Sequence, residues 1–233
     1  YYHFGRDPDF DLKLMGWVNR VRAQKRLGAQ PPHEFLELGH LLDELRLFKS
    51  KGEIALMRRS AEIAAEAQVA AMLATPSARF EYEVEAALQH VYRKNNAVAS
   101  YEPIVGSGAN ACVLHYRANN APIKKGDLLL CDAGAEYGFY ASDITRTWPT
   151  NGRFSKAQRE LYDIVLAAQL ECIGKAAVGV AYDVIHQAAV QVITDGAAPT
   201  LPYDFIRLFI VSAKAAKDFS TKDTANEGFN SGK

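Results

Sequence analysis

The sequence predicts an α+β fold. Capping boxes, in which a serine is followed three residues later by a glutamate or glutamine, predict helices that start at Ser50 and at Ser155. Between these helices, short apolar segments separated by glycine-containing turns predict short strands and one β-hairpin. The pattern therefore favours helices packed on a small antiparallel sheet.

The expected elements follow in chain order. An amphipathic helix near Phe10–Leu27 precedes a break at Pro31-Pro32. The helix from Ser50 runs to about Leu73, and further helices are expected over residues 81–94, 155–175 and 181–193. The segment SYEPIVGSGANACVLHY predicts a short strand, a glycine-rich loop and a second short strand. From Thr194 the chain becomes polar apart from FIRLFIV, which predicts a poorly ordered tail.

Composition excludes several classes of partner. Lysine plus arginine and aspartate plus glutamate both number 27, so nothing favours nucleic acid or an anionic membrane as a partner. No apolar run reaches the ~18 residues of a membrane span. Cys112, Cys131 and Cys172 are odd in number and widely spaced. They indicate a reducing compartment, and hence a cytoplasmic location.

The hairpin segment CDAGAEYGFYASDITRTW contains two aspartates, although aspartate is a poor strand former. If the chain turns at Tyr137-Gly138, Asp132 lies directly opposite Asp143, and Gly134 lies opposite Ala141. Opposed side chains share a face, with Cβ atoms about 4.5–5.5 Å apart. Thr145 would lie on that face and could hydrogen-bond a metal ligand, whereas Leu129 and Ile144 would point toward a core.

Two carboxylates held this close repel one another. One of them takes up a proton, or a cation lies between them. The plainer alternative is that Asp132 and Asp143 are solvated residues near a turn. The flanking sequence is apolar on both sides, which predicts a buried setting in which unpaired carboxylates are costly. This setting favours a cation that bridges the pair.

The stretch DAGAEYGFYASDITRTWPTNGRFSKAQRELYDIVL resembles the metal-binding hairpin of proline-specific aminopeptidases, also called aminopeptidase P or Xaa-Pro aminopeptidases. These are pita-bread metallopeptidases related to prolidase, creatinase and methionine aminopeptidase. The resemblance extends back to LRLFKSKGEIALMRRSAEI and covers roughly residues 40–193. It implies the first half of a pita-bread domain over residues 50–193. Residues 1–49 would be the end of an N-terminal domain with its linker, and residues 194–233 a divergent tail.

The resemblance also implies roles for single residues. Asp132 and Asp143 match two aspartate ligands of a site for two divalent ions, usually Mn²⁺, and Asp143 would bridge the ions. Thr145, which the predicted register and not the resemblance places on the same face, would hydrogen-bond one of these ligands. His115 matches a histidine that hydrogen-bonds the substrate carbonyl or the tetrahedral intermediate. On the residues alone, a packed core histidine is the alternative for His115.

The ligand set of that family also needs one histidine and two glutamates from the second half of the domain. No histidine follows His186, and Glu227 is the only glutamate after Thr194, so these ligands have no candidate here. We expect a metal-dependent aminopeptidase that releases the residue preceding proline from a peptide, and a homo-oligomer in its complete form. The alternatives are an inactive fragment, a non-enzymatic pita-bread binding module, or a prolidase-like dipeptidase.

Overall fold

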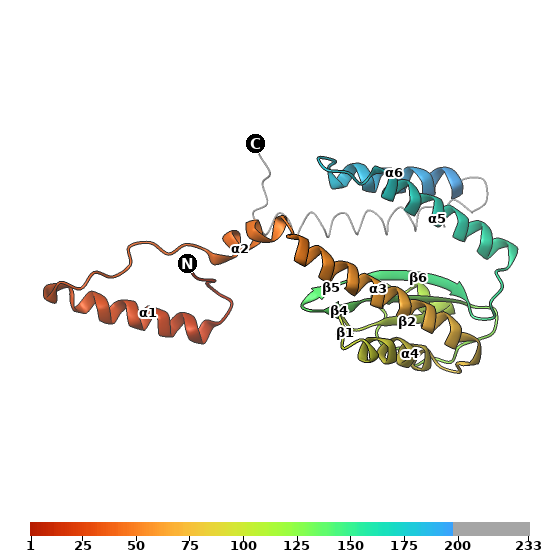
Figure 1. Ribbon diagram of the computed structural model, residues 1–233, viewed down its shortest axis with the longest axis horizontal. Helices are drawn as coiled ribbons and strands as arrows, with labels where there is room; N and C mark the ends of the chain where they lie inside the picture. The colour runs from red at the N-terminus through yellow and green to blue at the C-terminus, as the bar shows by residue number, and fades with distance from the viewer. Residues whose placement is uncertain (198–233) are drawn as a thin grey trace. The chain divides into compact units, whose positions relative to one another are not determined.

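The protein is built from helices and short antiparallel strands, as the sequence predicts. The computed structural model describes residues 1–197 (Figure 1). The elements in chain order are α1 (Pro8–Ala23), η1 (Lys25–Leu27), α2 (Leu38–Leu47), α3 (Lys51–Ala74), η2 (Thr75–Ser77), α4 (Glu81–Lys94), β1 (Val98–Ala99), β2 (Ile104–Ser107), η3 (Gly108–Cys112), β3 (Leu128–Ala133), β4 (Ala135–Tyr137), β5 (Tyr140–Ala141), β6 (Ile144–Pro149), α5 (Lys156–Lys175) and α6 (Tyr182–Ala197).

Both predicted capping boxes are confirmed. The Ser50 amide donates to Glu53 Oε2 at 2.6 Å, and the Glu53 amide donates to Ser50 Oγ at 3.3 Å. Ser155 and Gln158 exchange the equivalent pair of bonds at 2.8 and 3.3 Å. Helices α3 and α5 therefore begin where the sequence predicts, because these side chains satisfy the first free amides of each helix.

Helix α6 differs from the prediction at its end. It continues four residues past the expected boundary at 193, to Ala197. The remaining tail, including FIRLFIV and Glu227, lies outside the described residues, so the expectation of a poorly ordered tail stays a prediction.

The chain divides into two compact units. Unit 1 comprises residues 1–67, 89–101 and 133–144, and unit 2 comprises residues 68–88, 102–132 and those from 145 onward. A three-stranded sheet of order β1-β4-β5 lies in unit 1. A second sheet of order β2-β3-β6 lies in unit 2, apart from the end residues Ala133 and Ile144.

Strand β3 is the central strand of the sheet in unit 2, and one of its faces is buried. Its residues alternate, so that Leu129 and Cys131 are fully buried while Leu130 and Asp132 are half-buried. This alternation confirms that Leu129 points into a core, and it places Cys131 on the same buried side. On β6, Trp148 is buried, and its indole Nε1 donates to Thr75 Oγ1 at 2.9 Å.

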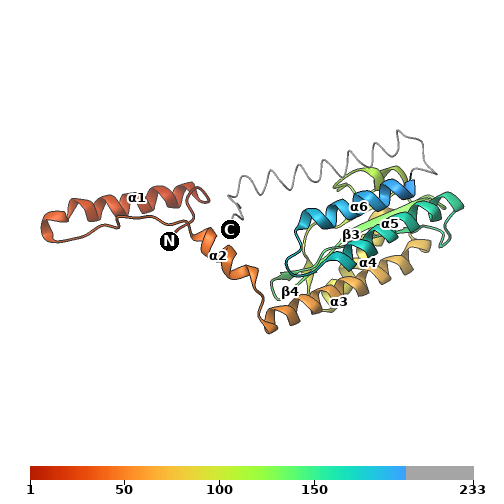
Figure 2. The ribbon, with the colours of Figure 1, turned by 90° about the horizontal axis from the view of Figure 1, so that it is seen from above.

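Helices α5 and α6 of unit 2 lie side by side and run in opposite directions (Figures 1 and 2). Two contacts near opposite ends of the pair fix this packing. Cys172 Sγ lies 3.4 Å from the Ile185 carbonyl oxygen, and Gly196 packs against Ile164. The pair is a helical hairpin.

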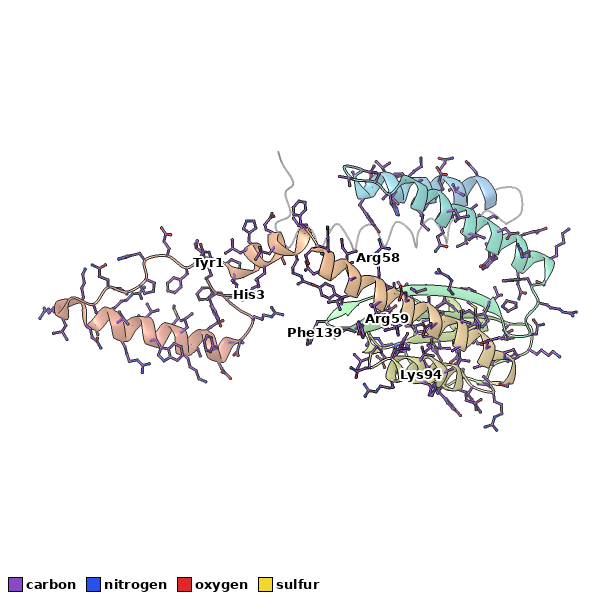
Figure 3. All side chains as sticks on the ribbon, viewed as in Figure 1. Tyr1, His3, Arg58, Arg59, Lys94 and Phe139 are labelled. Carbon is purple, nitrogen blue, oxygen red and sulfur yellow. The ribbon has the colours of Figure 1, made fainter. Side chains whose placement is uncertain are left out.

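The tip of the β4–β5 hairpin in unit 1 corrects the predicted register. Glu136 is opposite Ala141 and Tyr137 is opposite Tyr140, so the turn is Gly138-Phe139 and not Tyr137-Gly138. Gly134 consequently does not face Ala141. Both turn residues have positive φ, 58° and 69°, as a two-residue turn of type I′ requires for its twist to match the strands. Phe139 lies at this turn, 94% exposed (Figure 3).

The two strands of the hairpin are interrupted between the tip and the base. Gly134 separates β3 from β4, and Ser142 and Asp143 separate β5 from β6. The backbones approach closely at this point, since a Cβ atom on Gly134 would lie 1.7 Å from the Ser142 carbonyl oxygen. Asp143 thus stands in a break between strands, which explains how a poor strand former is accommodated.

One hydrogen bond, whose strength depends on the ionisation of a carboxylate, connects this hairpin to α3 within unit 1. The Tyr140 hydroxyl donates to Glu53 Oε1 at 2.7 Å. The backbone hydrogen bond from Ser50, followed by that from Tyr140, lowers the pKa of Glu53 from 4.5 to about 2. These bonds favour the ionised carboxylate and therefore the folded state.

We expect the stability contributed by Glu53 to be lost on acidification. Because its folded-state pKa is depressed, the contribution is full above pH 4.5 and falls as the pH drops toward 2. Denaturant midpoints at pH 5 and at pH 2.5 measure the loss for the wild type and for Glu53→Gln. The variant should lose less on acidification, and equal losses would contradict the assignment.

Candidate metal centre

Asp132 and Asp143 lie in different local settings. Asp132 is on β3, opposite Ile104 of β2, and is half-buried. Asp143 is exposed, at the break after β5. The expectation that both carboxylates are buried is therefore wrong for Asp143, because the chain leaves the sheet there and the side chain meets solvent. Asp132 belongs to unit 2 and Asp143 to unit 1, and their facing one another stays a prediction.

Tyr101 holds the Asp143 carboxylate in place. Its hydroxyl donates to Asp143 Oδ1 at 2.8 Å. A hydrogen bond to an ionised acceptor is about twice as strong as a neutral one, so it restrains the carboxylate while leaving the other oxygen for a ligand. Tyr101 was not predicted from the sequence, because its contact with Asp143 spans 42 residues and no local pattern indicates it.

His115 does not lie on a strand, which corrects the second strand expected in SYEPIVGSGANACVLHY. After β2 the chain forms the 3₁₀ helix η3, and His115 follows in a turn with φ of 54°. Histidine is one of the residue types that tolerate this left-handed conformation. The side chain is exposed, so the alternative of a packed core histidine is wrong as well.

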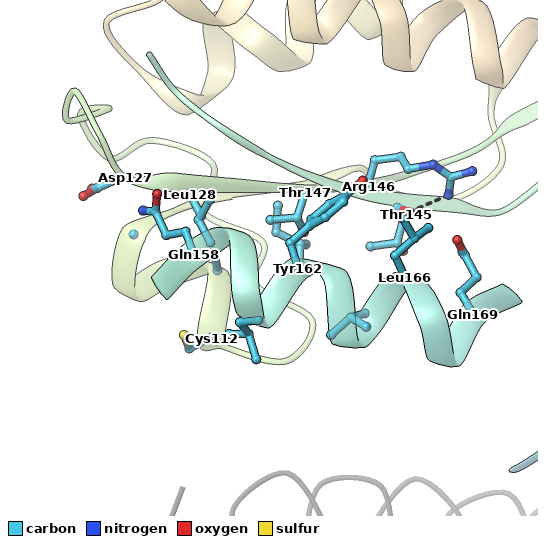
Figure 4. A pocket seen from close by; sticks show the side chains of 15 residues that line it. Cys112, Asp127, Leu128, Thr145, Arg146, Thr147, Gln158, Tyr162, Leu166 and Gln169 are labelled. Atoms are coloured by element: carbon cyan, nitrogen blue, oxygen red, sulfur yellow. Dashed lines mark hydrogen bonds between the residues drawn. The ribbon is translucent and has the colours of Figure 1, made fainter. Parts of the chain in front are cut away.

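Thr145 is exposed on β6, and its carbonyl oxygen accepts a hydrogen bond from the Arg146 guanidinium at 2.8 Å. It borders a cavity of about 680 Å³ within unit 2. Figure 4 shows Leu128 and Thr147 of the sheet facing Tyr162 and Leu166 of α5 across this cavity. The support of a metal ligand by Thr145 stays a prediction.

The donors fit a hard divalent ion in type but not in number. Carboxylate oxygens suit Mn²⁺. Among residues 1–197, no group of three or more histidine, cysteine, aspartate or glutamate side chains is placed to hold a metal. Cys131 is not a thiolate donor at neutral pH, since burial raises the pKa of its thiol to about 12. Among the described residues, Asp132 and Asp143 therefore stay candidate ligands.

Within the described part of the chain, every helix is too short or too polar to cross a bilayer. The three cysteines are all free thiols.

Comparisons with known proteins agree on one family. The sequence profile of metallopeptidase family M24 matches residues 55–219. The Xaa-Pro aminopeptidase of Escherichia coli is 42% identical over 167 residues, which are 71% of this chain and 38% of that protein. The Xaa-Pro aminopeptidase of Haemophilus influenzae is 48% identical over 141 residues, 60% of this chain and 33% of that protein.

A solved structure gives the same result. The aminopeptidase PepP of Pseudomonas aeruginosa superposes with a TM-score of 0.83 at 46% identity, covering 93% of this chain and 50% of that one. The chain therefore spans only about a third to a half of the length of these relatives.

Proposed function

We propose, from the premise that this chain belongs to metallopeptidase family M24, that it carries half of the active site of a proline-directed aminopeptidase. Such an enzyme would release the N-terminal residue that precedes proline in a peptide. The observation that supports this best is the exposed Asp143 carboxylate, held by Tyr101 in a break between two strands. A carboxylate that is restrained and yet open on one side is suited to bind a metal ion.

In this proposal Asp132 and Asp143 would be ligands of two divalent ions, preferably Mn²⁺, and Asp143 would be shared by both. When bound, such ions polarise the scissile carbonyl and lower the pKa of a bound water. His115 would hydrogen-bond the substrate carbonyl from its exposed turn, and Thr145 would support the ligands. One histidine and two glutamates would have to come from outside the described residues.

The proposal also covers the location, assembly and domain organisation of the protein. The three free thiols favour a cytoplasmic location. A homo-oligomer is proposed for the complete protein. The proposed domain organisation is the end of an N-terminal domain with its linker over residues 1–49, half of a pita-bread domain over residues 50–193 and a divergent tail over residues 194–233. A prolidase-like dipeptidase is the second candidate, because the residues that select peptide length are not identified in this chain.

A chimera tests the function. Residues 1–193 are joined to the portion of the Haemophilus influenzae enzyme that aligns after residue 193 of this chain. We expect the chimera to cleave an Xaa-Pro tripeptide only with added Mn²⁺. The 233-residue polypeptide alone should bind Mn²⁺ weakly and give no measurable cleavage, since metal affinity follows the number of preorganised ligands.

Each outcome of this experiment has a definite meaning. A folded chimera with no Mn²⁺-dependent cleavage would contradict the peptidase, as would full activity after removal of bound metal. Tight binding of two ions by the 233-residue polypeptide would show that its ligand set is larger than proposed.

A further inference from the structure

Glu81, the first residue of α4, is completely buried, and its carboxylate accepts four hydrogen bonds. The Ser107 amide and Asn110 Nδ2 donate to Oε1 at 2.8 and 3.1 Å. The Tyr116 hydroxyl and the Ala121 amide donate to Oε2 at 2.9 and 3.0 Å. Both oxygens of a buried carboxylate are therefore engaged by a single segment of the chain.

That segment is the loop over residues 107–121, which contains His115. Its first and last residues both donate backbone amides to Glu81, so one side chain closes the loop at its two ends. Tyr116, whose hydroxyl is a third donor, directly follows His115. The backbone of His115 is thus held one residue away from a buried anchor.

A second carboxylate, on the next turn of the same helix, also binds this loop. Glu85 Oε2 accepts from Asn119 Nδ2 at 2.9 Å. Asn119 is itself buried; its Nδ2 also donates to the Pro103 carbonyl oxygen at 2.7 Å, and its Oδ1 accepts from the Val105 amide at 2.9 Å. Residues four apart share one face of a helix, so α4 presents both carboxylates to this loop.

We propose that Glu81 is a positioning residue that sets the conformation of the His115 turn. His115 has a left-handed backbone and an exposed side chain, so burial of its own imidazole does not fix it. The bonds that Glu81 accepts from the loop instead limit where the imidazole can lie. The role of His115 toward substrate rests on the proposed function, but its placement by Glu81 does not.

The experiment uses the 233-residue chain without metal. Imidazole ¹H–¹⁵N signals of His115 are assigned by their loss in His115→Gln and then compared among variants. Glu81→Ala should shift and broaden the His115 signals, and exchange of the Ser107 and Ala121 amide protons should accelerate about tenfold or more. Glu81→Gln keeps one acceptor oxygen and should restore part of both effects.

Thr75→Val is the matched control in the same unit. It removes a buried hydroxyl that donates to Ala71 and accepts from Trp148, without touching the loop. It should lower stability while leaving the His115 signals unchanged. If Glu81→Ala does not fold, Tyr116→Phe removes a single donor beside His115 and should still shift its signals.

Unchanged His115 signals in a folded Glu81 variant or in Tyr116→Phe would overturn the proposal and leave Glu81 with a purely stabilising role. Equal shifts in Thr75→Val would overturn it as well. Because no metal or substrate is present, this result is independent of the peptidase test. An inactive chimera would reject the proposed function without altering the His115 spectrum.

Discussion

Replacing Asp143 with asparagine is expected to lower the Mn²⁺-dependent cleavage by the chimera on the order of 10³-fold or more. Loss of a group that hydrogen-bonds a metal ligand typically lowers metal affinity or activity about 10–100-fold. Loss of a ligand shared by two ions should lower activity further. The amide of asparagine keeps the volume of the side chain and one acceptor oxygen for the Tyr101 hydroxyl, but it removes the charge. Initial rates with an Xaa-Pro tripeptide at saturating Mn²⁺ measure the loss.

Tyr101→Phe supplies the graded comparison. It removes the hydroxyl that donates to Asp143 Oδ1 and leaves the carboxylate in place. Its activity should fall about 10–100-fold, between wild type and Asp143→Asn, and a higher Mn²⁺ concentration should recover part of it. Retained activity in Asp143→Asn would remove this residue from the ligand set, whatever Tyr101→Phe does.

Gly134→Ala is expected to destabilise unit 1 by about 3 kcal/mol or more. The added Cβ would lie 1.7 Å from the Ser142 carbonyl oxygen and 2.5 Å from Ser100 Oγ. The nearest obstacle is backbone, so a side-chain rotation cannot relieve it. The strand break would have to open, which would disturb the bonds from the Ser142 amide to Ala135 and from the Ser100 amide to Gly134.

Urea denaturation followed by circular dichroism measures the effect of Gly134→Ala. Gly174→Ala is the opposite control, because Gly174 lies within α5 and an added Cβ there meets no atom within 4 Å. It should raise stability by up to about 1 kcal/mol through better helix propensity. Wild-type stability in Gly134→Ala would mean that the strands separate more easily at this break than the close approach indicates.

The helices were predictable from sequence because their signals are local. Serine capping boxes placed the starts of α3 and α5, and α4 has the predicted bounds of 81–94. The resemblance carried by residues 132–166 predicted the family, and the TM-score to the Pseudomonas aeruginosa enzyme confirms the α+β class and the expected half of a pita-bread domain. These features depend on residues close together in the chain.

The parts that were predicted wrongly depend on geometry that local sequence does not encode. The turn at Gly138-Phe139 places a phenylalanine at positive φ, which residue preferences disfavour. The loop around His115 is shaped by Glu81, more than 25 residues earlier, and not by its own strand propensity. The roles of Asp132 and Thr145 at a metal ion stay predictions.

The burial of Trp148 gives unit 2 its own fluorescent signature. The chain has two tryptophans, of which Trp148 in unit 2 is 8% exposed and Trp17 in unit 1 is 45% exposed. An indole in an apolar interior emits at shorter wavelength than one in contact with water. In a Trp17→Phe variant, the wavelength of maximum tryptophan emission would therefore report on the core of unit 2 alone. The unfolding rate of that core could then be measured separately from the rest of the molecule.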